Sequence, residues 1–157
     1  MNADQALPTA AEVMQRDVTS FRPDQDVAEA LQTLLQRRIS GGPVVADRRL
    51  VGMFSERDGL QFLAASTYES EPSGTVSQHM RTEFRTVAAD ADLFALAELF
   101  QNNPVRRLPV VDGEGRLLGL VLRSDVIRAL HALVDRRTPR RTAARTPYER
   151  IAEILAD

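Results

Sequence analysis

The sequence predicts a mixed α/β fold of the α+β kind, in which one β-α-β-β-α motif occurs twice and the two copies pack with pseudo-twofold symmetry. Residues 43–45 (Pro-Val-Val), a polar turn and a second apolar stretch indicate a β-hairpin, and residues 55–58 (Ser-Glu-Arg-Asp) indicate that a helix begins directly after it. The same order returns from residues 109–111 (Pro-Val-Val) to Asp125. The offset is 66 residues at the prolines (109 − 43) and 67 at the closing aspartates (125 − 58), because the second turn is one residue longer. A duplication whose length change lies in a turn indicates a structural repeat, and this repeat decides the fold class.

The first copy begins with a helical lead-in. Thr9 and Glu12 have the spacing of a capping box, which predicts a short helix. A short strand is expected over residues 18–22. A helix is expected from Asp26, because its apolar positions recur every three or four residues and form one buried face. The hairpin and a helix over residues 57–65 complete the copy.

The second copy repeats this order after a polar linker that contains Pro and Gly. A short helix is expected before Met80, a strand near residues 85–87, a helix after Asp92 and a last helix over residues 124–134. The expected organisation is a flexible arm (1–8), a first motif (9–66), a linker (67–75), a second motif (76–134), and an arginine-rich connector with a short amphipathic C-terminal helix from Pro147 (135–157).

Composition limits the class of protein. A chain of 157 residues with 43% hydrophobic residues suits one compact domain or two small ones that share a core. The net charge of -2 gives no general attraction to nucleic acid or to an anionic membrane. The chain has no cysteine, and no apolar run approaches the length of a membrane span, so a cytoplasmic protein is expected. All 20 residues of the Lys and Arg class are arginine, which makes arginine the main cation for any anion-binding site.

The closing aspartates, Asp58 and Asp125, are the strongest candidates for a function. A carboxylate accepts hydrogen bonds from both hydroxyls of a cis-diol, so it suits a ribose, and at a helix N-terminus it lies beside backbone N–H groups that bind phosphate. The alternative is that Ser55 and Asp58 only cap the helix, since the same spacing stabilises a first turn without any ligand.

These motifs resemble those of paired CBS domains, which are named after cystathionine β-synthase and are also called Bateman modules. The resemblance covers residues 10–134 and rests on the double occurrence of Pro-Val-Val, a turn, an apolar-Gly-apolar segment and a closing Asp. It implies that the closing Asp holds the ribose of an adenosyl ligand. It also implies that the hydroxyl three residues earlier, which is Ser55 in the first copy, lies near phosphate.

The resemblance further implies contacts to the other parts of such a ligand. Arginines in the loop before the second hairpin and in the helix-start motifs would reach phosphate, whose geometry matches a guanidinium; solvated surface arginines are the alternative. The adenine would lie between apolar surfaces of the first strand and the loop before the hairpin, where core packing is an equal explanation. The candidate ligand-binding residues are Thr19, Ile39, Ser40, Gly41, Pro43, Ser55, Arg57 and Asp58 in the first copy, and Thr86, Val105, Arg106, Arg107, Pro109, Arg123, Ser124 and Asp125 in the second.

Other kinds of site are disfavoured. Gly113 and Gly115 superficially resemble a phosphate-binding loop, but they lie in a hairpin turn rather than between a strand and a helix. His79 and His131 have no second ligand at the spacing of a metal site, and no nucleophile lies in a pattern with a base. Neither a metal site nor catalysis is therefore expected.

The predicted function is that of a stand-alone regulatory module with no enzymatic activity and no required cofactor. The module would bind AMP or ATP in the cleft between the copies, with S-adenosylmethionine or NAD ranked behind them. It would form a homodimer and signal to a regulated partner protein. The alternatives are a dimerisation scaffold with empty clefts, and nucleic-acid binding through the arginine-rich tail, which the lack of interleaved aromatic residues disfavours.

The two clefts are expected to be unequal. Leu122 stands where the first copy has Ser55, so the second copy lacks one hydroxyl. We therefore expect tighter binding beside Asp58, unless Arg106 and Arg107 reverse the ranking.

Overall fold

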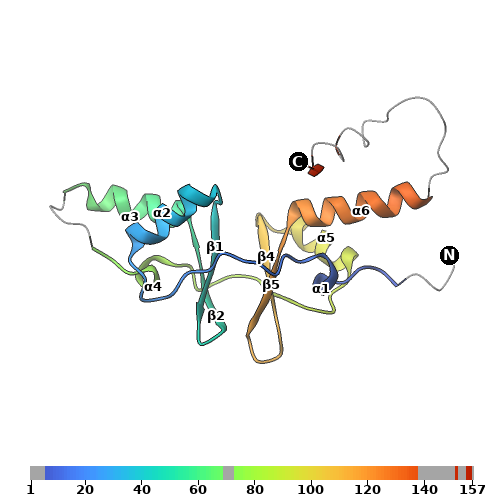
Figure 1. Ribbon diagram of the computed structural model, residues 1–157, viewed down its shortest axis with the longest axis horizontal. Helices are drawn as coiled ribbons and strands as arrows, with labels where there is room; N and C mark the ends of the chain where they lie inside the picture. Colours follow the sequence, from blue (N-terminus) through green and yellow to red (C-terminus); the bar gives the residue numbers. More distant parts are fainter. Residues whose placement is uncertain (1–5, 69–72, 138–150, 152–154, 157) are drawn as a thin grey trace. The chain divides into compact units, whose positions relative to one another are not determined.

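The computed structural model describes residues 6–68, 73–137, 151, 155 and 156. These residues belong to two compact units (Figure 1). The Asp58 unit consists of Asp17–Thr86 and Val111–Leu118, and the Asp125 unit consists of Met1–Arg16, Val87–Val110 and Gly119–Asp157. Each unit therefore holds the main part of one sequence copy together with the lead-in segment that precedes the other copy.

The Asp58 unit is built on an antiparallel hairpin of β1 (Gly41–Ala46) and β2 (Arg49–Ser55). α2 (Val27–Arg37) packs against α3 (Glu56–Ala65), which continues into η1 (Ser66–Tyr68), and α4 (Val76–His79) contacts β2. The core of the unit combines one face of α2 with side chains of the hairpin and of both flanking helices. Its buried members are Phe21, Val27, Ala30, Leu34, Val44, Phe54, Phe62 and Val76.

The helix expected after Asp26 is confirmed as α2. The Asp26 carboxylate accepts hydrogen bonds from the backbone N–H groups of Ala28 (2.7 Å) and Glu29 (3.4 Å), so it caps the first turn. At the other end Arg38 adopts the left-handed conformation with φ 53°, which stops the helix.

The strand expected over residues 18–22 is reduced to one parallel bridge, between Phe21 and Val44. Phe21 N–H donates to Pro43 O and Val45 N–H donates to Phe21 O, both at 2.9 Å. The next ladder bonds on either side would need an N–H from Pro43 and one from Pro23, and proline has none. The two prolines therefore stop the ladder after a single residue pair.

The Asp125 unit contains most of a three-stranded sheet in the order β3-β4-β5, formed by β3 (Val87–Ala88), β4 (Arg107–Val111) and β5 (Leu117–Leu122), whose ends next to the turn belong to the Asp58 unit. α5 (Leu93–Asn102) packs against α6 (Arg123–Arg137), which α1 (Ala10–Val13) also contacts. The predicted helices are confirmed, and α6 is longer than expected. Among its described residues, the apolar side chains with no exposed surface are Ala10, Leu93, Leu96, Leu108, Val110 and Val121.

Two short helices, α1 at the start of the first copy and α4 at the start of the second, are the lead-in helices, and their contacts explain why the compact units differ from the sequence copies. In the Asp125 unit, the N–H groups of Ala10 and Ala11 at the start of α1 donate to Ala91 O (2.8 Å) and Ala89 O (2.9 Å). In the Asp58 unit, the N–H groups of Val76 and Ser77 at the start of α4 donate to Gln25 O (2.8 Å) and Pro23 O (2.9 Å). The first N–H groups of a helix have no partner within it, so each lead-in helix is held by the loop before the long helix of the other copy.

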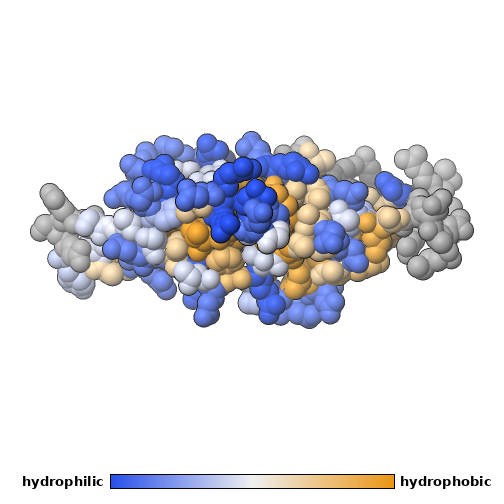
Figure 2. All heavy atoms as spheres, turned by 90° about the horizontal axis from the view of Figure 1, so that it is seen from below, coloured by the Kyte–Doolittle hydropathy of each residue, from blue (hydrophilic) through white to orange (hydrophobic). Residues whose placement is uncertain are grey.

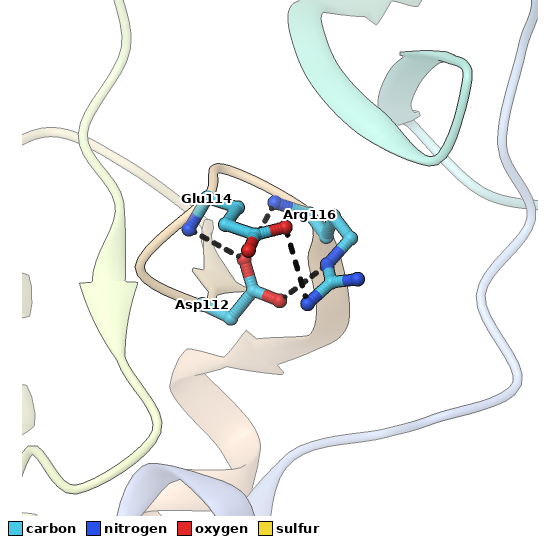
Figure 3. Close-up of polar contacts among 3 residues, drawn as sticks. All are labelled: Asp112, Glu114 and Arg116. Carbon is cyan, nitrogen blue, oxygen red and sulfur yellow. Dashed lines mark hydrogen bonds and ion pairs between the residues drawn. The ribbon is translucent and has the colours of Figure 1, made fainter.

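The turn of the second hairpin belongs to the Asp58 unit and is held by its own side chains (Figure 3). The Asp112 carboxylate accepts from Arg116 Nε at 2.7 Å, from Arg116 N–H at 3.0 Å and from Glu114 N–H at 2.9 Å. These hydrogen bonds, those from Arg116 first, lower the pKa of Asp112 below its ordinary value. The glycines at positions 113 and 115 thus lie in a hairpin turn, as expected, and Gly115 takes the positive φ of 77° that this turn needs.

Several expectations concern segments outside the described residues, namely residues 1–5 of the arm, 69–72 of the linker and 138–150 of the connector. Of the predicted C-terminal helix, Ile151, Leu155 and Ala156 are described, and they are helical. Leu155 O accepts a hydrogen bond of 3.2 Å from Arg128 Nη2 in α6. Within the described ranges, no helix combines the length and the apolar character that a membrane span requires.

Candidate functional site

Asp58 lies at the point where the first hairpin passes into α3. Its Oδ2 accepts hydrogen bonds from Ser55 N–H (2.8 Å) and from the Ser55 hydroxyl (2.9 Å), and Ser55 Oγ lies 3.4 Å from Asp58 N. These contacts form a capping box, so the capping role that the sequence left open is present.

The cap uses only part of the acceptor capacity of Asp58. Asp58 is 6% exposed, and its Oδ1 accepts no hydrogen bond from the residues that the structure describes. A carboxylate has about four lone-pair positions, so Oδ1 is able to accept hydroxyl donors while Oδ2 holds the helix end.

Asp125 occupies the equivalent position of the second copy but has more partners. Its Oδ2 accepts from Leu122 N–H at 2.8 Å, the counterpart of the bond from Ser55 N–H. Its Oδ1 accepts from Gln15 Nε2 at 3.4 Å and from Arg128 Nη1 at 3.3 Å. Asp125 is 7% exposed, so both buried carboxylates are similar in burial and differ in how many donors they already hold.

The other candidates of the first copy lie in the Asp58 unit, as does Thr86. Ser40 O accepts from Glu56 N–H at 2.9 Å, which joins the loop before β1 to the start of α3. Thr19 Oγ1 accepts from Arg37 Nη1 at 3.1 Å. Ile39 packs against the hydrophobic core and Pro43 is fully buried, so core packing accounts for both. Gly41 is buried in β1, whereas Arg57 and Thr86 are exposed.

The remaining candidates, Val105, Arg106, Arg107, Pro109, Arg123 and Ser124, lie in the Asp125 unit. Arg123 N–H donates to Arg106 O at 3.4 Å, which brings these two exposed arginines together at the N-terminus of α6. The equivalent pair in the Asp58 unit is Glu56 and Ser40, so at these two positions the start of α6 has two arginines where the start of α3 has a glutamate and a serine. Pro109 is buried in β4.

Sequence reasoning missed the residues that contact Asp125. Gln15 is separated from Asp125 by 110 positions along the chain, and no local pattern marks it. The repeat marks Gln15 only as the counterpart of Arg81, because Gln15 follows Met14 in the first copy as Arg81 follows Met80 in the second. Arg128 lies three residues after Asp125 on α6, a helical spacing at which side chains meet.

A metal centre finds no support in the described part of the chain, where no group of three or more His, Cys, Asp or Glu side chains is placed to hold an ion. Most of the charged side chains lie at the surface, and the buried acids are Asp58 and Asp125 among the described residues. The chemistry available beside them is hydrogen bonding to a neutral polyol or to an anion through arginine.

A hairpin followed by a capped helix, present twice with exchanged lead-in helices, defines a tandem-repeat module. The family model described as CBS domain matches residues 10–65 and again residues 76–132. The chain therefore belongs to the CBS domain family, and the resemblance inferred from its motifs is confirmed.

Similar proteins agree with this assignment. The crystal structure of CBSX2 in complex with AMP has a TM-score of 0.70 and 28% identity, and the match covers 80% of this chain and 98% of that one. The cytosolic domain of the Mg²⁺ channel MgtE in complex with ATP has a TM-score of 0.64 and 30% identity, with 76% of this chain and 47% of that one covered. Both support the duplicated CBS fold.

Inosine-5′-monophosphate dehydrogenase of Aquifex aeolicus is 36% identical over 111 residues, which cover 69% of this chain and 22% of the enzyme. The chain spans less than half the length of the curated relatives it matches first. The match to the dehydrogenase is thus partial and does not carry that enzyme's activity to this chain.

Proposed function

We propose that this protein is a regulatory module that binds an adenosine-containing ligand, with Asp58 as the acceptor of the ribose hydroxyls. The observation that carries the proposal is the buried carboxylate of Asp58, whose Oδ1 accepts no hydrogen bond from a described residue. Within the described residues no fully buried side-chain oxygen lacks a partner, so Oδ1 reaches solvent, and a cis-diol can replace water as its donor. AMP and ATP rank first as ligands, because similar proteins have been crystallised with them. S-adenosylmethionine and NAD rank behind.

The Asp58 site is proposed to bind more tightly than the Asp125 site. A ribose that approaches Asp125 has to displace Gln15 and Arg128, whereas Asp58 Oδ1 has no described donor to displace. Hydrogen bonds to charged groups are worth ~1.5–3 kcal/mol, which corresponds to roughly a ten- to hundredfold difference in affinity. Arg106 and Arg123 raise the affinity of the Asp125 site instead, because they add positive charge for phosphate at the start of α6.

Calorimetric titration with AMP and ATP tests the proposal on the unmodified protein, Asp58→Asn and Asp125→Asn. Asparagine keeps one oxygen that can accept from Ser55 N–H, so the helix cap survives, but its amide presents a donor to the ribose. Asp58→Asn is expected to weaken the tightest binding at least tenfold. Asp26→Asn is the matched control, because Asp26 caps α2 in the same unit and has no proposed ligand.

Two outcomes would contradict the proposal. Loss of the tightest binding in Asp125→Asn alone would reverse the ranking of the sites. A protein that binds no adenine nucleotide at all would favour the dimerisation scaffold.

Binding is proposed to act on a partner protein by favouring one of two arrangements of the module, in proportion to the difference in affinity between them. The module is also proposed to be a homodimer. Apolar side chains reach the surface in several places (Figure 2), and Leu60 (67% exposed), Leu63 (48%) and Ile127 (50%) lie on the helices that follow the hairpins. A second copy would cover them. Light scattering at micromolar concentration should give the mass of a dimer, and the mass of one chain would argue against this assembly.

A further inference from the structure

The lead-in segments place two residues at equivalent positions beside the two hairpins. In the Asp125 unit, Gln15 and Leu120 exchange both backbone hydrogen bonds at 2.9 Å. In the Asp58 unit, Arg81 and Met53 exchange the same two bonds, at 2.8 and 2.9 Å. The residue before each, Met14 or Met80, lies against the glycine before the paired strand residue, Gly119 or Gly52. Gln15 and Arg81 are therefore structural counterparts.

The contact made by Gln15 shows in which direction a side chain at this position extends. In an antiparallel pair that exchanges both hydrogen bonds, the two side chains project from the same face of the sheet. From this position Gln15 Nε2 reaches Asp125 Oδ1 at 3.4 Å. Arg81 starts from the equivalent point in the Asp58 unit, and its side chain is longer than that of Gln15.

The guanidinium of Arg81 is also available. Arg81 is exposed, and its side chain has no hydrogen bond or ion pair with any residue that the structure describes. Ser55, whose hydroxyl caps α3, lies two residues after Met53 on β2 and therefore on the same face of the strand as the Arg81 side chain. The start of α3 thus has a carboxylate oxygen with no described donor, and an exposed arginine lies on the segment paired with β2.

We propose that Arg81 is a ligand-binding residue of the Asp58 site and holds a phosphate of the nucleotide whose ribose Asp58 accepts. This inference rests on the proposed function and deepens it, because it assigns the Asp58 site to phosphorylated nucleosides rather than to nucleosides or thioether analogues. Arginine binds phosphate through two parallel N–H donors, which glutamine cannot reproduce. The counterpart Gln15 instead spends its amide on Asp125, so the exchange of Gln for Arg between the copies gives the two sites different ligand preferences.

Calorimetric titration of AMP and adenosine into the unmodified protein, Arg81→Gln, Arg81→Lys and Asp58→Asn tests the assignment. Arg81→Gln is expected to weaken AMP roughly ten- to hundredfold and to change adenosine less than about twofold, because it removes a charged hydrogen bond that only the phosphate makes. Arg81→Lys should restore part of the loss, since the charge returns without the fork. Arg85→Gln is the matched control, because it removes one exposed arginine from the same segment. Thermal melts of all variants show that each is folded.

The outcomes separate this inference from the proposed function. If Asp58→Asn abolishes AMP binding while Arg81→Gln leaves it unchanged, or weakens AMP and adenosine equally, the role of Arg81 is refuted and the proposed function stands. If the unmodified protein binds neither AMP nor adenosine, both are refuted. A loss of AMP affinity in Arg85→Gln as large as in Arg81→Gln would also refute the assignment, because general charge would then explain the effect.

Discussion

The docking of the lead-in segments on the hairpins depends on two glycines, and replacing them should have unequal costs. A Cβ at Gly119 would lie 2.6 Å from Met14 Sδ and 2.7 Å from the backbone oxygen of Gln15. A Cβ at Gly52 would collide with Met80 Sδ but would lie 3.1 Å from the backbone oxygen of Arg81. The end of a methionine side chain moves easily, whereas the backbone of a residue held in two hydrogen bonds to the strand does not.

Gly119→Ala should therefore force the lead-in backbone away from β5, whereas Gly52→Ala is mostly absorbed by Met80. Overpacking of this kind costs about 1–3 kcal/mol, and we place Gly119→Ala at the upper end and Gly52→Ala at the lower end. In a chain of this size each kcal/mol lowers the melting temperature by about 2–4 °C.

Denaturant unfolding and amide hydrogen exchange measure this difference. The free energy of unfolding should fall more in Gly119→Ala than in Gly52→Ala, and exchange of residues 10–15 should accelerate in the first variant. Gly113→Ala is the control, because nothing lies within 4 Å of a Cβ at that position. Equal stability of Gly119→Ala and the unmodified protein, or a larger loss in Gly52→Ala, would refute the argument.

Three further predictions concern the hairpin turns and the Asp125 site. Asp47 and Arg48 have φ angles of 50° and 67°, so the double variant Asp47→Asn, Arg48→Gly should raise the unfolding free energy by about 1 kcal/mol; an unchanged denaturant midpoint would contradict this. The folded-state pKa of Asp112 is lowered from its ordinary value of 3.8, so the ionised group stabilises the fold above that pH and this contribution disappears as the pH falls through the lowered pKa. Asp112→Asn should therefore flatten the loss of stability below about pH 4 in acid unfolding curves, and identical curves would argue against the role of Arg116. In an Asp58→Asn background, Gln15→Ala with Arg128→Ala should strengthen adenosine binding by up to about tenfold in calorimetry, because Asp125 Oδ1 loses both competing donors; weaker binding would show that these donors help the ligand instead.

The residues that local signals describe best are those at the ends of helices. Ser55 and Asp58 form the capping box that their spacing offered, and Asp26 and Asp92 cap the helices that were expected to begin there, because a capping bond joins residues only two or three positions apart. The buried face of α2 and the two hairpins were likewise predictable, since side-chain periodicity depends on the local backbone alone. The repeat added the fold class, and the CBS domain family model confirms it.

The strand over residues 18–22 shows where local signals fall short. A strand was expected here and only Phe21 pairs, because the length of a ladder depends also on the donors of its partner strand. Pro43 became relevant only when the fold placed it opposite Thr19 O, and Pro23 ended the pairing on the other side.

The sequence by itself determined the repeat, the caps, the hairpins and the two aspartates that close them. The tertiary structure decided which lead-in helix joins which copy, and it thereby decided the surroundings of those aspartates. Gln15 donates to Asp125 across 110 positions of sequence, and the backbone of Arg81 pairs with Met53 at the equivalent place beside the other hairpin. Contacts of this range leave no periodic trace, because they depend on the path of the chain between the two residues and not on the residues near either one.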